Sequence, residues 1–406
     1  MRPTQYAMSG LDSIFDGIRP YYDSEIPASI SRMRGFEYLD DIADFLQIEG
    51  GGNTMRSALD KCRTVDDFQD KIMAMVMDHV LSRTSAGVEY SGLGYFEQGQ
   101  KHLILANHRD IVLDSAIIQL IFHRKGITTT EIAVGDNLIT SQFIEDVARS
   151  NKMIKVTRST SPREVYNSSL LLSKYIRHQI TTEASSIWIA QRNGRTKDGY
   201  DLTEQGLLKM VQMSGAGDFV EDMDCLKIVP TAISYEFEPC DALKTREIFV
   251  SRRHPYVKAE GEDLNSIITG MKSWKGRIMI CFTEPILRSE IESCSSFAKN
   301  ERFVELGKII DRQIHSEYHL WPNNYAAEDI LRERSGQEPA FRGKYGKAGM
   351  ETFKIHMQEQ IDALIAELMK EDGLGPADEK EWRKELEDIF LHIYANPVEA
   401  CLKAKV

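Results

Sequence analysis

The alternation of short apolar segments with helical patterns, from about residue 88 to residue 285, constrains the fold of this chain most. Runs of four to eight mostly apolar and β-branched residues are separated by stretches with helical periodicity. This order predicts an α/β fold, with a mixed sheet flanked by helices. The expected strands cover residues 102–106, 129–134, 153–157, 186–190, 227–234, 246–250 and 277–282. The expected helices between them cover residues 114–124, 141–150, 162–179 and 203–214.

Helical segments are expected on both sides of this α/β part. Before it, one helix is predicted to begin near Ser24 and Pro27 and to stop at the glycine run 50–52, and a second to cover residues 64–82. After residue 325 a basic connector leads to two more helices, the last from about residue 378 to residue 394. The connector contains Arg332, Arg334, Arg342, Lys344 and Lys347. The last helices are expected either to pack on the α/β part or to lie on a membrane with the connector as a basic anchor.

With 406 residues the chain is long enough for two or three domains. We therefore expect an N-terminal helical region at 1–87, an α/β domain at 88–325 and a C-terminal helical region at 326–406.

Charge and cysteine usage exclude several classes of protein. A net charge of −12 argues against a nucleic-acid binder, which needs a basic face. The six cysteines are far apart and form no CxxC pair, which is typical of reduced thiols in a cytoplasm and predicts no zinc site. No apolar run approaches 18 residues, so no spanning helix is expected. The chain is predicted to be cytoplasmic, with no metal and no cofactor.

A His and an Asp stand where an apolar strand is predicted to lead into a helix. Residues 101–120 read KHLILANHRDIVLDSAIIQL, with the strand ending at Ala106. Loops at the carboxyl ends of strands are exposed yet held by rigid elements, so they often carry functional groups. A carboxylate fixes the tautomer of an imidazole and lets its other nitrogen accept a proton. His108 with Asp114 is therefore a candidate general-base pair, and Asp110 is an alternative partner for His108.

Cationic residues follow two other predicted strands. Arg158 comes just after the strand at 153–157, and the segment IWIAQRNGRTKDG places Arg192, Arg195 and Lys197 beside two glycines. A guanidinium group can make two charge-assisted hydrogen bonds to a phosphate, and a glycine-containing turn after a strand favours an anion cradle. These residues predict a phosphate site next to the His108 turn.

Four blocks in this order resemble the glycerolipid acyltransferases, which acylate glycerol 3-phosphate or its 1-acyl derivative. NHRDIVLD resembles their first motif, although five residues rather than four separate its His from its Asp. The run Gly-Asp-Asn-Leu from residue 135, with Arg158 after the next strand, resembles the second. Asn193-Gly194-Arg195 stands where the family has a Glu-Gly-x-Arg-like run, so the carboxylate of that run is missing. The strand around Pro230 resembles the fourth block, whose Pro lies near the acyl chain.

The resemblance covers roughly residues 88–285 and implies direct acyl transfer without a metal. His108 would take the proton from a glycerol hydroxyl, with Asp114 behind the imidazole, and Arg158, Asn193, Gly194, Arg195 and Lys197 would form the substrate site. The expected donor is acyl-CoA or acyl carrier protein, and the acceptor is glycerol 3-phosphate or 1-acylglycerol 3-phosphate.

A lipid product also implies peripheral contact with the inner face of the membrane. The alternative is a catalytically silent lipid-phosphate or acyl-carrier binding protein with the same fold, which the extra residue in the first block and Asn193 would favour.

Overall fold

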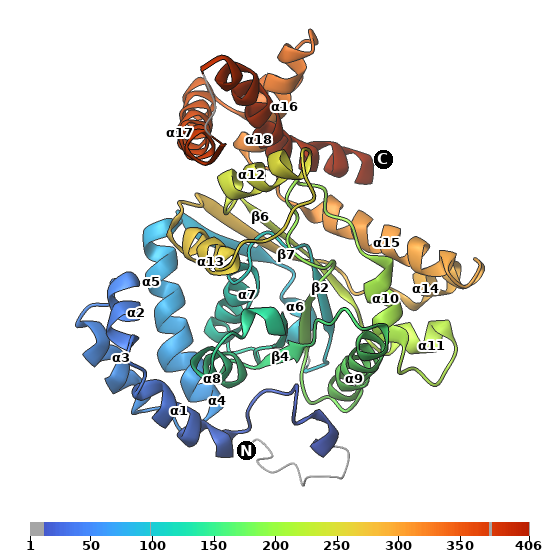
Figure 1. Cartoon of the computed structure of the whole chain (residues 1–406). Helices are drawn as coiled ribbons and strands as arrows, with labels where there is room; N and C mark the ends of the chain where they lie inside the picture. The colour runs from blue at the N-terminus through green and yellow to red at the C-terminus, as the bar shows by residue number, and fades with distance from the viewer. Residues whose placement is uncertain (1–11, 98, 373–375, 406) are drawn as a thin grey trace.

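A seven-stranded mixed sheet forms the centre of the computed structural model, which describes residues 12–97, 99–372 and 376–405 (Figure 1). The strand order is β1-β7-β6-β2-β5-β3-β4. Strands β6 and β7 are antiparallel, and the other neighbours run parallel. The strands are β1 (Gly87–Ser91), β2 (Leu103–Ala106), β3 (Glu131–Gly135), β4 (Met153–Val156), β5 (Ile187–Ala190), β6 (Val229–Tyr235) and β7 (Arg277–Phe282).

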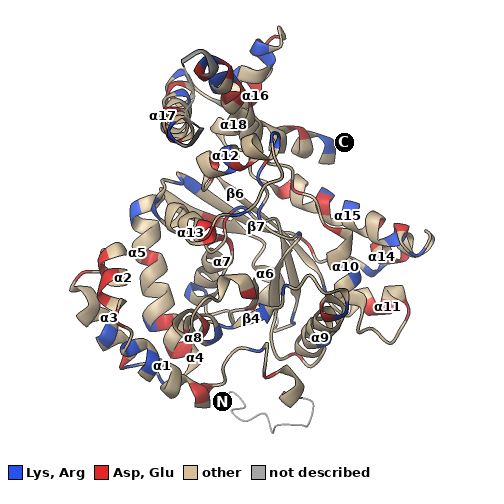
Figure 2. Cartoon of the chain, in the orientation of Figure 1, with Lys and Arg blue, Asp and Glu red and all other residues tan. Residues whose placement is uncertain are grey.

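Two hydrophobic cores cover the two faces of the sheet. Because successive side chains of a strand point to opposite faces, Ile104 and Ala106 of β2 belong to one core, and Leu103 and Leu105 belong to the other. All four are fully buried, as expected for a strand with parallel neighbours and helices on both sides. Figure 2 shows the charged residues mainly on the surrounding helices, while the strands are mostly uncharged. The predicted fold class is confirmed.

The helices of the sheet region occupy the connections between strands and the segment after β7. They are α6 (Gly94–Glu97), α7 (Leu113–Arg124), α8 (Gln142–Ser150), α9 (Pro162–Thr181), α10 (Gln205–Gln212), α11 (Phe219–Asp224), α12 (Asp241–Ser251), α13 (Glu262–Lys272), α14 (Arg288–Ser295) and α15 (Glu301–Glu317).

The predicted strand at 246–250 is wrong, because these residues lie in α12. The β-branched Ile248 and Val250 suggested a strand, but the buried side chains of this segment recur at helical spacing. They are Asp241, Lys244, Thr245 and Phe249. The prediction also missed β1, an edge strand without a fully buried residue. Among the described residues, β1 pairs only with β7.

The N-terminal helices differ from the prediction at the glycines. The expected helix up to residue 50 is two helices, α1 (Ile26–Arg34) and α2 (Leu39–Phe45), because the chain turns after Gly35 and stacks Phe36 on Phe143 at a ring distance of 4.0 Å. The glycine run starts α3 (Gly51–Leu59) instead of ending a helix, with Gly50 in the left-handed region (φ 81°).

The second predicted N-terminal helix is continuous but not uniform. It consists of α4 (Val65–Phe68), a π-helical segment (Gln69–Ala74) and α5 (Met75–Thr84). Residues 1–11 of the predicted N-terminal region lie outside the described residues.

Three C-terminal helices form a third core above the edge of the sheet at which β6 ends (Figure 1). They are α16 (Pro322–Arg334), α17 (Lys347–Asp372) and α18 (Pro376–Ala404), and α12 packs against them. The apolar side chains of α17 at Ile361, Leu364, Ile365 and Leu368 are buried in this core. These side chains therefore serve packing, which was one of the two roles expected for the last helices.

The predicted boundary at residues 325 and 326 falls inside α16, and the domain limits stay a prediction. Within the part of the chain that the structure describes, every helix is too short or too polar to cross a bilayer.

Glu131 gives the folded protein a testable pH dependence. Its carboxyl is buried at the start of β3 and accepts a 2.7 Å hydrogen bond from the Tyr175 hydroxyl. Burial raises the pKa of Glu131 to about 7, against the opposing effects of Tyr175 and Lys152. The pKa of Glu131 is therefore higher in the folded protein than in the unfolded chain. Below about pH 4.5 the carboxyl is protonated in both states and costs no stability. As the pH rises from there through about 7, the free energy of unfolding falls, because ionisation is easier in the unfolded chain.

Glu131→Gln stays neutral, so we expect it to raise the free energy of unfolding at pH 8 by about 1–3 kcal/mol. The difference from the unmodified protein should vanish near pH 4.5. Denaturant unfolding of both proteins at the two pH values measures this, and parallel pH profiles would contradict it.

Candidate active site

The His108 turn connects β2 to α7 at the carboxyl end of the strand. Asn107 is fully buried and fixes the start of the turn on β6: its side chain accepts from the Ile233 N–H at 2.7 Å and donates to the Ile233 carbonyl at 3.0 Å. His108 follows, and its side chain lines a cavity. The strand pairing therefore sets where the imidazole emerges from the sheet.

Asp114 contacts the His108 imidazole, with 2.9 Å between Nδ1 and Oδ2. The carboxylate also accepts from the backbone N–H groups of Arg109 at 2.6 Å and Asp110 at 2.9 Å, and from the Tyr235 hydroxyl at 2.7 Å. Burial alone would raise the pKa of Asp114, but the hydrogen bonds and the neighbouring imidazole outweigh it and lower the pKa. An ionised Asp114 thus holds Nδ1–H, and Nε2 is the nitrogen that can take a proton.

Asp110, the alternative partner of His108, caps the helix instead. Its Oδ1 accepts from the N–H groups of Val112 and Leu113, both at 2.9 Å, just where α7 begins. The extra residue of the first block is accommodated in this turn, since Asp114 reaches back to the N–H groups that precede it. The four N–H groups bound by Asp110 and Asp114 are therefore not free to stabilise an oxyanion.

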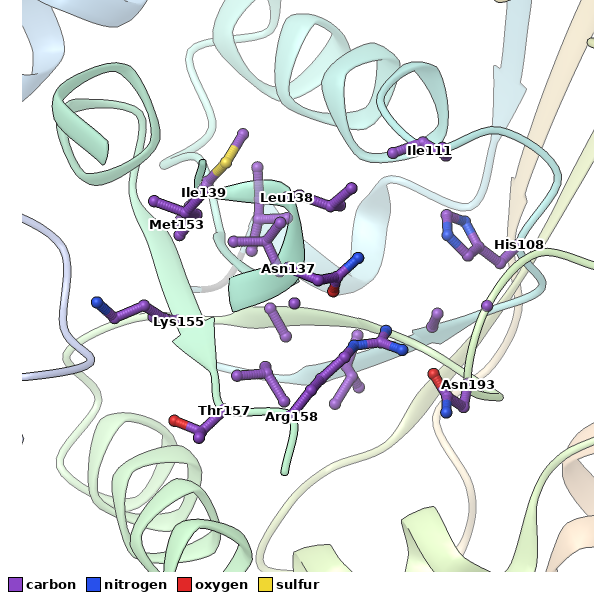
Figure 3. Close-up of a pocket in the computed structure, with 18 of the residues that line it drawn as sticks. His108, Ile111, Asn137, Leu138, Ile139, Met153, Lys155, Thr157, Arg158 and Asn193 are labelled. Atoms are coloured by element: carbon purple, nitrogen blue, oxygen red, sulfur yellow. The ribbon is translucent and has the colours of Figure 1, made fainter. Parts of the chain in front are cut away.

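A cavity of about 780 Å3 begins at His108 and continues under the carboxyl ends of β3, β4 and β5 (Figure 3). Asn137, Arg158 and Asn193 lie on the side of the cavity where His108 is found (Figure 3), and Arg192 and Arg195 also belong to its wall. The rest of the wall is mainly apolar and includes Ile132, Val134, Ile144, Val147, Met153, Val156, Leu171 and Leu172. Ile18 and Met73 of the N-terminal region contribute to the same wall. This lining suits a molecule with a charged head and an apolar tail.

Arg158 extends into the cavity from the end of β4, toward the side on which His108 and Asn193 lie (Figure 3). Its guanidinium packs on Gly135, where a Cβ atom would lie only 2.6 Å from Nε. The glycine of the second block therefore makes room for Arg158. Among the described residues, no carboxylate forms an ion pair with this guanidinium.

The loop between β5 and α10, here called the Arg195 loop (residues 191–204), carries the other predicted cations. Arg195 donates from Nη2 to Ser266 Oγ at 3.1 Å, while its buried Nη1 has no hydrogen-bond partner in the described structure. Lys197 forms an ion pair with Glu247 of α12. Asn193 and Gly194 are exposed at the cavity wall, with Gly194 in the left-handed region (φ 78°). Arg158 and Arg195 thus keep positive charge for a ligand, whereas the charge of Lys197 is largely neutralised.

Pro230 of the fourth block lies away from this cavity. It is buried in β6, between β2 and β7 in the sheet, and its carbonyl accepts from Thr283 N at 3.0 Å. It is not among the described residues that line the cavity. The proline therefore has a structural place in the sheet and is not at an edge.

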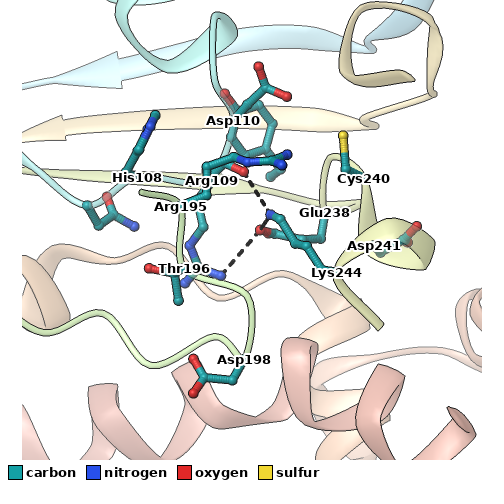
Figure 4. A network of polar contacts seen from close by, with 12 residues as sticks. His108, Arg109, Asp110, Arg195, Thr196, Asp198, Glu238, Cys240, Asp241 and Lys244 are labelled. Atoms are coloured by element: carbon teal, nitrogen blue, oxygen red, sulfur yellow. Dashed lines mark hydrogen bonds and ion pairs between the residues drawn. The ribbon is translucent and has the colours of Figure 1, made fainter. Parts of the chain in front are cut away.

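A buried ionic network lies behind the His108 turn (Figure 4). Arg109 is fully buried and forms an ion pair with Asp201 of the Arg195 loop, and its carbonyl accepts from Lys244 Nζ at 2.7 Å. Lys244 also contacts Glu238 at 2.6 Å. These residues and Tyr235 could not be predicted from the sequence, because nothing in the spacing of Asp201, Glu238 or Lys244 links them to His108.

The α/β part of the chain matches a known protein family. Residues 87–234, from β1 to β6, match the family model described as Acyltransferase. The chain carries an acyltransferase domain. The resemblance to the glycerolipid acyltransferases is therefore confirmed at this level. The matched range contains His108, Asp114, Arg158 and the Arg195 loop, whereas α12, α13 and the C-terminal helices that contact this loop lie outside it.

Two other comparisons add little to the acyltransferase assignment. No curated protein matches the chain. Among solved structures, the chain is similar to the 1-acyl-sn-glycerophosphate (LPA) acyltransferase PlsC from Thermotoga maritima, with 12% identity and a TM-score of 0.38 over 71% of this chain and 91% of that one.

Proposed function

We propose that the protein is an O-acyltransferase that moves a fatty acyl group from acyl-CoA or acyl carrier protein to a hydroxyl of glycerol 3-phosphate or 1-acylglycerol 3-phosphate. The observation that carries this proposal is that His108, paired with Asp114, lines a large and mainly apolar cavity beside Arg158 and Arg195. Arg158 and Arg195 supply positive charge in its wall. A phosphate head would bind there, and an acyl chain would occupy the apolar part.

In the proposed reaction, His108 Nε2 takes the proton of the acceptor hydroxyl as its oxygen attacks the thioester carbonyl. Asp114 stabilises the imidazolium that forms. When the tetrahedral intermediate collapses, the carbon–sulfur bond breaks and the imidazolium protonates the leaving thiolate. An ester and a free thiol result, and His108 returns to its neutral form.

The alternative function is a catalytically silent lipid-phosphate or acyl-carrier binding protein. It is favoured by Asn193, which replaces a carboxylate of the family at the exposed cavity wall. Free thiol released from acyl-CoA, measured with and without glycerol 3-phosphate, separates the two. We expect release that depends on a glycerophosphate, whereas a binding protein releases none above the rate without acceptor.

The two arginines should serve the acceptor. We expect Arg158→Ala and Arg195→Ala each to raise the KM for the phosphate acceptor by about ten- to a hundredfold, since a charge-assisted hydrogen bond contributes about 1.5–3 kcal/mol. The KM for the acyl donor should change little. Arg163→Ala removes an exposed cation of α9 that is outside the cavity wall and serves as the control. Equal effects on donor and acceptor would assign the arginines to the donor or to the fold.

We further propose that the protein acts in the cytoplasm and contacts the inner face of the membrane peripherally, because its product would carry an acyl chain. The basic connector would contribute to this contact. Part of the positive charge of the connector is neutralised by ion pairs within the protein. Arg334 contacts Glu387 and Asp388 at 2.5 Å, and Arg342 contacts Glu333 at 3.6 Å.

A further inference from the structure

The Arg195 loop is bound on one side to the His108 turn. The N–H of Thr196 donates to the carbonyl oxygen of His108 itself, at 2.8 Å. The Thr196 hydroxyl donates to Asp201 at 2.6 Å, and Asp201 pairs with the buried Arg109. The position of the loop on this side is therefore set directly by the residue proposed as the base.

On its other side, the same loop is bound to α18. Asn396 Nδ2 donates to the Asp198 carbonyl at 2.6 Å, and the Tyr200 hydroxyl donates to Glu399 at 2.9 Å. Between these contacts, Gly199 has φ 82°, and a Cβ atom there would lie 2.4 Å from the Ile393 carbonyl oxygen. The loop thus packs on α18 so closely that only glycine fits at residue 199.

A third contact ties the loop to α18 through α12. Lys197 pairs with Glu247 of α12, and Asp241 at the start of α12 accepts from the Tyr394 hydroxyl of α18 at 2.7 Å. The Tyr394 hydroxyl in turn accepts from the Glu238 N–H at 2.9 Å. Tyr394 is almost fully buried, so this link is part of a packed interface.

We propose that residues 393–399 of α18 are positioning residues for the phosphate acceptor: they hold the Arg195 loop, and with it Arg195, at a fixed place relative to His108. This inference rests on the proposed function. It follows physically because a loop without helix or strand hydrogen bonds keeps a precise geometry only when packed elements hold it from both sides. Here one side is the His108 turn and the other is a helix outside the matched acyltransferase domain.

Gly199→Ala tests this contact, because the added Cβ must push the loop away from α18. Gly336→Ala is the matched control: Gly336 has φ 78°, and nothing lies within 4 Å of a Cβ atom there, so it shares the backbone strain without the clash. We expect Gly199→Ala to raise the KM for glycerol 3-phosphate by about ten- to a hundredfold. The KM for acyl-CoA should be unchanged, and Gly336→Ala should alter neither value.

Hydrogen exchange gives a readout that does not depend on turnover. In Gly199→Ala, the amide of Thr196 and its neighbours in the Arg195 loop should exchange faster, while the amides of β2 and β5 keep their protection. Tyr200→Phe should give a smaller change in the same direction, because it removes only the hydrogen bond to Glu399. Glu399→Gln keeps an acceptor for the Tyr200 hydroxyl, so this variant should show the same exchange and the same KM as the unmodified protein.

Each outcome decides one question. A selective rise in acceptor KM together with faster exchange in the loop supports the positioning role. Equal behaviour of Gly199→Ala and Gly336→Ala overturns it, and so does a loss that affects both substrates alike with faster exchange across the whole sheet. If the unmodified protein transfers no acyl group to any glycerophosphate, the proposed function fails, and the exchange result alone then decides whether α18 holds the loop.

Discussion

Acyl transfer to a glycerophosphate is expected to fall by about 10²–10⁴-fold when His108 is replaced by alanine, which is the usual contribution of a general base. The thermal unfolding midpoint should change little. The His108 side chain donates one hydrogen bond, to Asp114, and makes an edge-on ring contact with Trp188 at a centroid distance of 5.8 Å. Without the imidazole, Asp114 still accepts from Arg109 N, Asp110 N and the Tyr235 hydroxyl. The carboxylate is therefore not left without partners, and the turn keeps its shape.

His123→Ala is the matched control for this substitution. His123 lies at the far end of α7 and also contacts an aspartate, Asp70, at 3.1 Å, but on the protein surface away from the large cavity. It should keep normal turnover and normal stability. A folded His108→Ala protein with near-normal turnover would rule out His108 as the base and favour the binding-protein alternative.

The strands could be predicted from the sequence because each is a short apolar run between turn signals, and six of the seven predicted segments overlap observed strands. The order and register of strands could not, since they depend on pairings between residues far apart, such as Leu105 with Pro230. The edge strand β1 was missed for a related reason. It is held in the sheet by its pairing with β7, and its residues show no strong apolar pattern. In α12, the β-branched residues favoured a strand in the prediction. The structure has a helix there, because the segment packs against the C-terminal core.

The position of the candidate site followed from the sequence, but the state of its charges did not. His108, Arg158 and Arg195 were proposed because each stands just after an apolar strand, and strands of a parallel sheet end on the same edge. The structure places all three in the wall of one cavity. The neutralisation of Lys197 by Glu247 and the burial of Arg109 against Asp201 involve partners tens of residues away. Only the folded chain shows which cations remain available to a phosphate.

The second large loss of activity is expected for Asp114→Asn. Asp110→Asn is its matched control, because Asp110 is the alternative partner of His108. Asp114→Asn should lower kcat/KM by about 10²–10⁴-fold without unfolding the protein. The oxygen of an amide can still accept from His108 and the two N–H groups, whereas the bond with Tyr235 reverses its direction, because the NH2 group donates to the Tyr235 hydroxyl oxygen. What it cannot supply is the negative charge that stabilises the imidazolium in the transition state.

Asp110→Asn removes the same charge from the same turn, so it controls for any general electrostatic effect. Its Oδ1 can still accept from Val112 and Leu113, and Oδ2 has no hydrogen-bond partner among the described residues. The cap of α7 should therefore survive, with little change in turnover or in the free energy of unfolding. Steady-state kinetics and denaturant unfolding of both variants settle the assignment. A large loss in Asp110→Asn with normal turnover in Asp114→Asn would mean that Asp110 is the partner of His108 during the reaction.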